Sequence, residues 1–97
     1  TNTNTNTNTN TNNPQEYQIT IEGFAYSPSE LTIKKGDTIT WTNKDTAKHT
    51  LTSDSGSELN SELLGKEQSY SHTFNQAGAF EYHCKPHLYM KAKIIVE

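Results

Sequence analysis

Apolar side chains alternate with polar ones along most of the chain after Tyr17, and this pattern limits the fold more than any other feature. Because successive side chains of a strand point to opposite faces, each alternating run predicts a β-strand with one buried face. Turn residues separate the runs, which predicts an all-β sandwich with a single core. The runs are Tyr17, Ile19 and Ile21; Leu31 and Ile33; Ile39 and Trp41; Tyr70, His72 and Phe74; and Phe80, Tyr82 and Cys84.

Two segments depart from this alternation. Residues 1–13 begin with six Thr-Asn repeats and carry no apolar side chain, so burial cannot offset the entropy lost on folding. We expect a disordered low-complexity tail there, either a native linker or an expression remnant, and one domain over residues 14–97. In the segment Ser57 to Leu64, leucines at helical spacing predict a short helix or a packed loop.

Composition excludes several classes of protein. The net charge of −3 is carried by interspersed acids and lysines, which leaves no basic footprint for nucleic acid. No apolar run approaches the length of a membrane span, so we expect membrane attachment only through an upstream anchor. The chain begins with Thr rather than Met, so we expect that any export signal has been removed or left out. We expect a monomer.

The chain has a single cysteine, Cys84, so it cannot form an intrachain disulfide. A domain this small often needs a cross-link for stability, and a bound metal is the kind that remains. The segment from Cys84 to Met90 places a thiol, the His87 imidazole and a thioether within seven residues. Strand parity puts Cys84 on the inner face and turns His83 away, while Pro86 ends the strand. Alone, Cys84 would be an inert buried thiol and Met90 a core residue, but together with His87 they predict a metal site.

A further donor has to come from elsewhere in the chain. From the residues alone, His49, His72 and His83 compete for this role. His72 shares a strand face with two aromatic residues, which favours a packed or hydrogen-bonded histidine. Two imidazoles, a thiolate and a weak thioether are the ligands of blue-copper sites, whereas zinc has little use for methionine. We therefore predict one type 1 copper ion, with packing of Met90 against the metal as the alternative to a bond.

Residues 66–90 resemble the C-terminal half of amicyanins, within the plastocyanin-like cupredoxins, and residues 28–43 resemble the N-terminal half. Two residues between Cys84 and His87, and two more before Met90, match the short amicyanin ligand loop. The resemblance implies a cupredoxin-like Greek-key β-sandwich with the ligands His49, Cys84, His87 and Met90. Many cupredoxins join their ligand loops through Asn and Ser or Thr side chains, at positions where this chain has Thr50 and Lys85.

The resemblance also implies a function, a one-electron carrier rather than an enzyme. Its place is extracytoplasmic, in the periplasm or at the cell surface, with tethering through the tail. Redox partner proteins, a dehydrogenase or cytochrome as donor and a cytochrome or oxidase as acceptor, would dock near Pro86, Leu88 and Tyr89. The alternatives are a copper storage or delivery protein with the same ligands, and an enzyme that uses Cys84 and His49 as nucleophile and base. The enzyme leaves Met90 unexplained.

Overall fold

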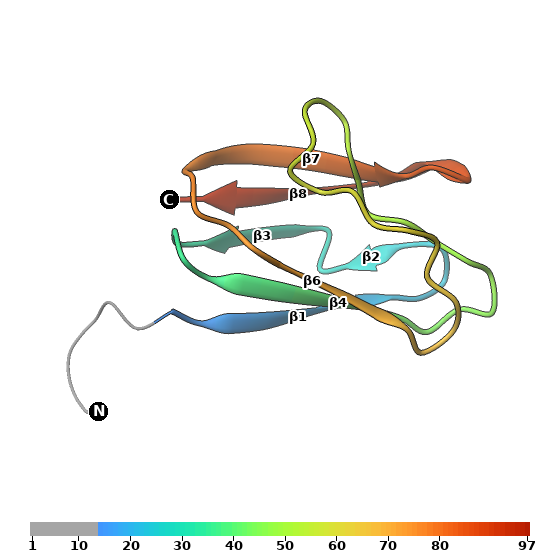
Figure 1. The fold of residues 1–97 in the computed structure, drawn as a ribbon. Helices are drawn as coiled ribbons and strands as arrows, with labels where there is room; N and C mark the ends of the chain where they lie inside the picture. The colour runs from blue at the N-terminus through green and yellow to red at the C-terminus, as the bar shows by residue number, and fades with distance from the viewer. Residues whose placement is uncertain (1–13) are drawn as a thin grey trace.

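The computed structural model describes residues 14–97, which form two facing four-stranded sheets and contain no helix (Figure 1). The predicted tail lies outside the described residues. In the described part of the chain, no helix is long and apolar enough to cross a membrane. The strands are β1 (Glu16–Ile21), β2 (Tyr26–Ser27), β3 (Glu30–Ile33), β4 (Thr38–Asn43), β5 (Thr52–Ser53), β6 (Ser69–Thr73), β7 (Gly78–Cys84) and β8 (His87–Val96).

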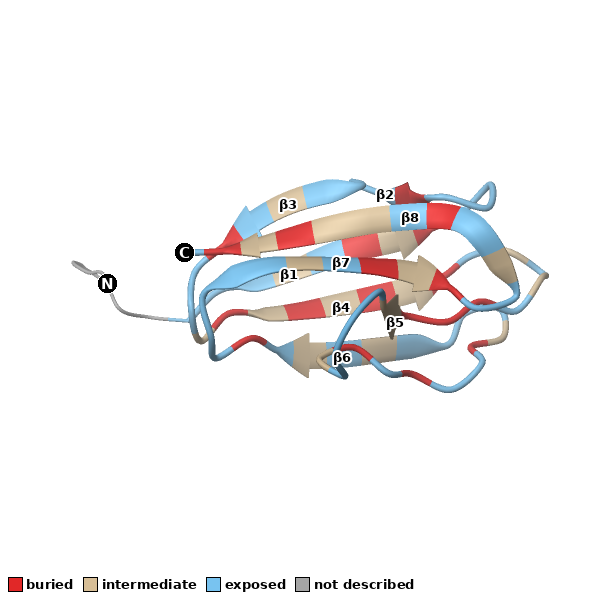
Figure 2. Cartoon of the chain, turned by 90° about the horizontal axis from the view of Figure 1, so that it is seen from above, coloured by how far each residue is buried: buried red, intermediate tan, exposed pale blue. Residues whose placement is uncertain are grey.

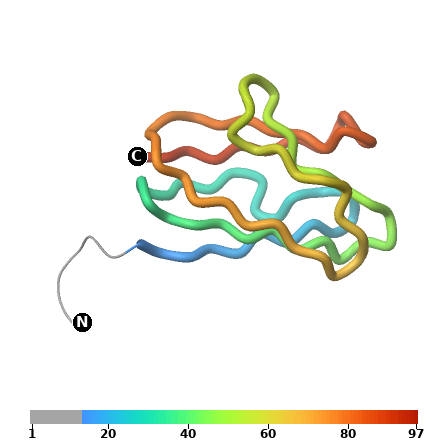
Figure 3. Tube along the Cα trace, viewed as in Figure 1, coloured from blue at the N-terminus to red at the C-terminus, as the bar shows by residue number. Residues whose placement is uncertain are grey.

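The two sheets have the orders β2-β1-β4-β6 and β3-β8-β7-β5. Strand β1 pairs with β4, and β3 with β8, in parallel, while the other pairs are antiparallel. The chain thus passes between the sheets several times, and this arrangement confirms the predicted Greek-key β-sandwich. Figure 3 shows the β1–β2 turn, the segment after β4 and the β7–β8 turn at the end of the sandwich opposite to the C-terminus.

The core follows the alternation predicted from the sequence. Buried residues alternate with partly buried ones along β4, and with exposed or partly buried ones along the second half of β7 (Figure 2). Trp41 of one sheet and Tyr82 of the other are both fully buried, and the Trp41 Nε1–H donates to the Tyr82 hydroxyl over 3.1 Å. This hydrogen bond satisfies two polar groups in the core and joins the two sheets.

Residues 57–64 form a packed loop, which settles the choice left open by the sequence. Leu59 and Leu64 are buried while Leu63 is 54% exposed. The backbone of Leu64 pairs with His49, and that of Asn60 with Thr52, in isolated β-bridges. These pairings to another segment use backbone groups that a helix would need for its own hydrogen bonds.

We predict that Tyr82→Phe lowers the free energy of unfolding by about 1–3 kcal/mol, because it leaves the buried Trp41 N–H without its acceptor. The measurement is urea unfolding of the metal-free protein. Tyr89→Phe is the matched control, since Tyr89 is 71% exposed and the change there should stay within about 0.5 kcal/mol. Equal unfolding midpoints for the two variants would contradict the role of this hydrogen bond.

Candidate metal centre

The β7–β8 hairpin brings Cys84 and His87 together. They are the last pair of the hairpin, and residues 85 and 86 form the turn between them. The preceding β7 residue, His83, pairs with Lys91, so residues 88–90 bulge out of the β8 ladder. The bulge leaves Leu88 65% exposed and returns the chain to the interior with Met90 2% exposed.

Three donor atoms converge behind this turn. The Cys84 Sγ lies 3.5 Å from the His49 Nδ1 and 3.4 Å from the His87 Nδ1. All three atoms lie within 4.8 Å of one another, and this is the one group of three or more His, Cys, Asp or Glu side chains found so close together within residues 14–97. Cys84 and His49 are fully buried, and His87 is partly exposed. One sulfur and two imidazole nitrogens, with a buried thioether three residues after His87, fit a single type 1 copper ion.

The other two histidines lie outside this cluster. His72 forms a hydrogen bond with the Glu58 carboxylate, and its ring packs edge-on against Phe74 with 4.7 Å between centroids. His83 points to the other face of β7, where its Nδ1 lies 2.6 Å from the Asp54 carboxylate. His72 is thus packed and hydrogen-bonded, and His83 points away from Cys84, as the sequence predicted for each. His49 is the histidine from another segment that the fold brings to Cys84.

His49 is held on both its backbone and its ring. Its N–H and carbonyl exchange hydrogen bonds with Leu64 at 3.2 and 2.8 Å. Its Nε2 lies 2.9 Å from an Asp45 carboxylate oxygen. Partial burial disfavours the charge of Asp45, but N–H donors from Phe24 and Gly23, together with His49, outweigh it and lower the pKa of this carboxyl below its ordinary value. Asp45 is therefore an ionised acceptor, and the Nε2 carries the proton.

Thr50 joins the two ligand segments. The Lys85 N–H donates to the Thr50 hydroxyl over 2.9 Å, and the Tyr26 hydroxyl donates to the Thr50 carbonyl over 2.6 Å. Burial raises the pKa of the Tyr26 phenol, which keeps it a donor. A bond from side chain to backbone thus replaces the pair of side chains that joins these loops in many cupredoxins.

Phe24 covers the exposed side of the histidine pair. Its ring meets the His87 ring edge-on at 4.9 Å between centroids, and the His49 ring at 5.2 Å. Sequence reasoning missed both Phe24 and Asp45. Asp45 lies in Asn43-Lys44-Asp45, which signals a turn, and Gly23-Phe24 is a turn signal followed by an isolated aromatic residue. Neither signal points to a partner so distant in the sequence.

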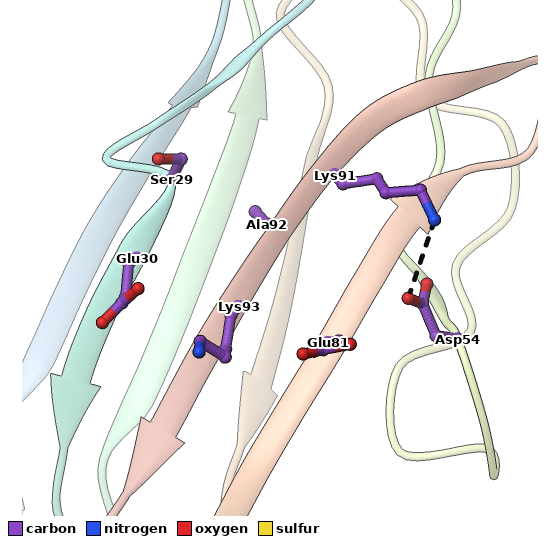
Figure 4. A pocket seen from close by; sticks show the side chains of 7 residues that line it. All are labelled: Ser29, Glu30, Asp54, Glu81, Lys91, Ala92 and Lys93. Atoms are coloured by element: carbon purple, nitrogen blue, oxygen red, sulfur yellow. Dashed lines mark ion pairs between the residues drawn. The ribbon is translucent and has the colours of Figure 1, made fainter.

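A shallow depression on the outer face of the second sheet has a different character (Figure 4). Its lining residues alternate in charge, with Lys93 of β8 opposite Glu30 of β3 on one side and Glu81 of β7 on the other. Lys91 also lies 4.0 Å from Asp54. This is a charge-paired, solvated strand face, and its lining offers no sulfur or imidazole donor.

Comparisons with known proteins agree with this geometry. The family model for copper binding proteins of the plastocyanin/azurin family matches residues 14–97. Amicyanin from Paracoccus denitrificans is 39% identical over 83 residues, which cover 81% of this chain and 63% of that protein. Plastocyanin from Scenedesmus fuscus is 38% identical over 72 residues, covering 64% of this chain and 74% of that protein. The chain thus spans less than two thirds of the length of the Paracoccus protein.

Solved structures of similar proteins share the fold as well. The crystal structure of amicyanin from Paracoccus versutus is 37% identical and superimposes with a TM-score of 0.77. The match covers 82% of this chain and 79% of that one. Fold similarity and sequence identity therefore extend over nearly the same part of the chain.

Removing the Thr50 hydroxyl should loosen the β7–β8 turn. We predict that Thr50→Val, which preserves the shape of the side chain, costs about 1 kcal/mol of folding free energy and speeds hydrogen exchange at the Lys85 N–H. The measurements are urea unfolding and amide exchange by NMR in the metal-free protein. Thr50→Ser retains the hydroxyl and should behave like wild type. Equal protection of the Lys85 N–H in both variants would contradict the assignment.

Proposed function

Because the chain belongs to the copper-binding plastocyanin/azurin family, we propose that it is a one-electron carrier with one type 1 copper ion. The ligands are His49, Cys84, His87 and Met90. The observation that carries this proposal is the buried convergence of the Cys84 sulfur with the Nδ1 atoms of His49 and His87. Met90 joins the set through its burial, its place at the end of the bulge and the soft character of its thioether.

The residues around the cluster suit electron transfer more than chemistry on a substrate. Copper supplies a one-electron redox couple when bound, and transfer is fast where the ligands move little between the two oxidation states. The ligand segments are anchored to the sheets by the His49–Leu64 backbone pair, the Thr50–Lys85 hydrogen bond and the β7–β8 ladder. We infer a carrier without catalytic activity of its own.

The apolar surface around His87 is the proposed docking face for redox partners. Leu88 and Tyr89 are 65% and 71% exposed, and Phe24 is 40% exposed. The rings of Phe24 and Tyr89 both lie near that of His87, with centroid distances of 4.9 and 6.2 Å. A small apolar face suits short-lived complexes with a donor dehydrogenase or cytochrome and an acceptor cytochrome or oxidase.

We place the carrier outside the cytoplasm, as a monomer tethered through its N-terminal residues.

A copper storage or delivery protein with the same ligands is the second candidate function. Delivery requires that the metal pass readily to another protein. Two of the proposed ligands, His49 and Cys84, are fully buried, and the Thr50–Lys85 bond closes the ligand segments around them. Such a site favours retention of the ion, and this supports the carrier function over copper delivery.

Copper binding can be tested by colour. Addition of Cu(II) to the purified protein should produce one intense visible thiolate-to-copper absorption band at one ion per chain. Cys84→Ser should abolish the band because it removes the thiolate, and His72→Ala should retain it because His72 pairs with Glu58. A colourless wild-type complex would reject the site, and a blue Cys84→Ser variant would reject the ligand assignment.

The docking face can be tested through electron self-exchange, in which two copies must bring their copper sites together. We predict that Leu88→Glu slows self-exchange by about tenfold through like-charge repulsion, without a change in the visible spectrum. NMR line broadening in mixtures of oxidised and reduced protein measures the rate. Gln76→Glu adds the same charge to the exposed β6–β7 turn at the other end of the sandwich, and should have little effect. Equal rates for the two variants would rule out this face.

A further inference from the structure

The Asp45 carboxylate lies where three hydrogen-bond donors meet. One oxygen accepts from the His49 Nε2–H and the Phe24 N–H, both at 2.9 Å, and the other accepts from the Gly23 N–H at 2.9 Å. The Asp45 N–H is itself fixed by the Asn43 side-chain oxygen at 2.8 Å. With 14% of its side chain exposed, Asp45 is a well-held anion that solvent screens weakly.

The backbone at Gly23 and Phe24 is shaped around this anion. Both residues have positive φ, 67° and 57°, and they form the tip of the β1–β2 connection, where the Glu22 N–H donates to the Ala25 carbonyl over 3.0 Å. Consecutive N–H groups in such a turn form a concave anion site, which the Asp45 carboxylate fills. Positive φ is uncommon for a bulky residue such as phenylalanine, so this conformation calls for a compensating contact. The Phe24 ring is thereby directed against the His49 and His87 rings.

We propose that Asp45 is a positioning residue for the copper site: through one carboxylate it orients His49, lowers the reduction potential and holds Phe24 over the histidine pair. This rests on the proposed function. A carboxylate only accepts, so it keeps the proton on the His49 Nε2 and leaves the Nδ1 lone pair facing Cys84. Its charge makes the imidazole a stronger donor and favours Cu(II), the more highly charged ion, over Cu(I).

The test compares Asp45→Asn with Asp54→Asn in the copper-loaded protein. Asp54 also pairs with a histidine, His83, but on the outer face of β7, so this control removes an equal charge from an Asp–His pair that lies outside the ligand cluster. We expect Asp45→Asn to weaken the preference for Cu(II) by about tenfold, which corresponds to a rise of about 59 mV in the reduction potential. Copper loss to a chelator should accelerate by about tenfold. A potential no higher than that of Asp54→Asn overturns the proposal.

A second measurement needs no copper and no variant. Nitrogen-15 NMR of the metal-free wild type should show His49 as the Nε2–H tautomer with a slowly exchanging ring proton, and nuclear Overhauser contacts between the Phe24 and His87 rings. The Nδ1–H tautomer, or absence of these contacts, overturns the proposal even if Asp45→Asn does not fold. If Cu(II) gives no blue wild-type protein, the proposed function fails, while the tautomer and ring contacts still decide the role of Asp45.

Discussion

Cys84 pairs with His87 across a two-residue turn, and the arrangement of the whole centre depends on this pairing. Because β7 lies between β8 and β5, neighbouring strands fix its direction on both sides, and alternation sends the Cys84 thiol into the core. The bulge that follows on β8 then exposes Leu88 and buries Met90. One hairpin thereby supplies buried soft donors on its inner side and an apolar contact surface on its outer side.

The parts predicted from the sequence are those set by local geometry. A period of two needs no knowledge of distant residues, so strands β1, β3, β4, β6 and β7, the core position of Trp41 and the inward thiol of Cys84 could be predicted from the alternation. The same parity correctly separated His83 from Cys84. The ligand loop is also local, because its three donor residues lie within seven positions of the chain, and they could therefore be predicted from their spacing. The choice of His49 over His72 depended on family resemblance, since nothing in its neighbours distinguished it.

The parts that the sequence did not predict are contacts between distant segments. The Thr50 hydroxyl meets the Lys85 N–H across 35 residues, and Asp45 meets the Phe24 N–H across 21. Such pairs arise from the order of strands in the two sheets, which hydrophobic periodicity does not encode. The loop around Leu64 shows the same limitation. Its leucine spacing is compatible with a helix, but hydrogen bonds to the His49 backbone hold it in an extended form.

The two histidines of the centre have unequal surroundings, and this asymmetry suits a carrier. His49 is fully buried, with an anion behind its ring, so its surroundings are preorganised and exchange little with solvent. His87 is partly exposed among apolar side chains, where a partner can approach its edge without having to displace a charged group. On the proposed function, the buried side sets the potential and the exposed side sets the rate of transfer. Because Phe24 touches both rings, the β1–β2 turn connects the two sides.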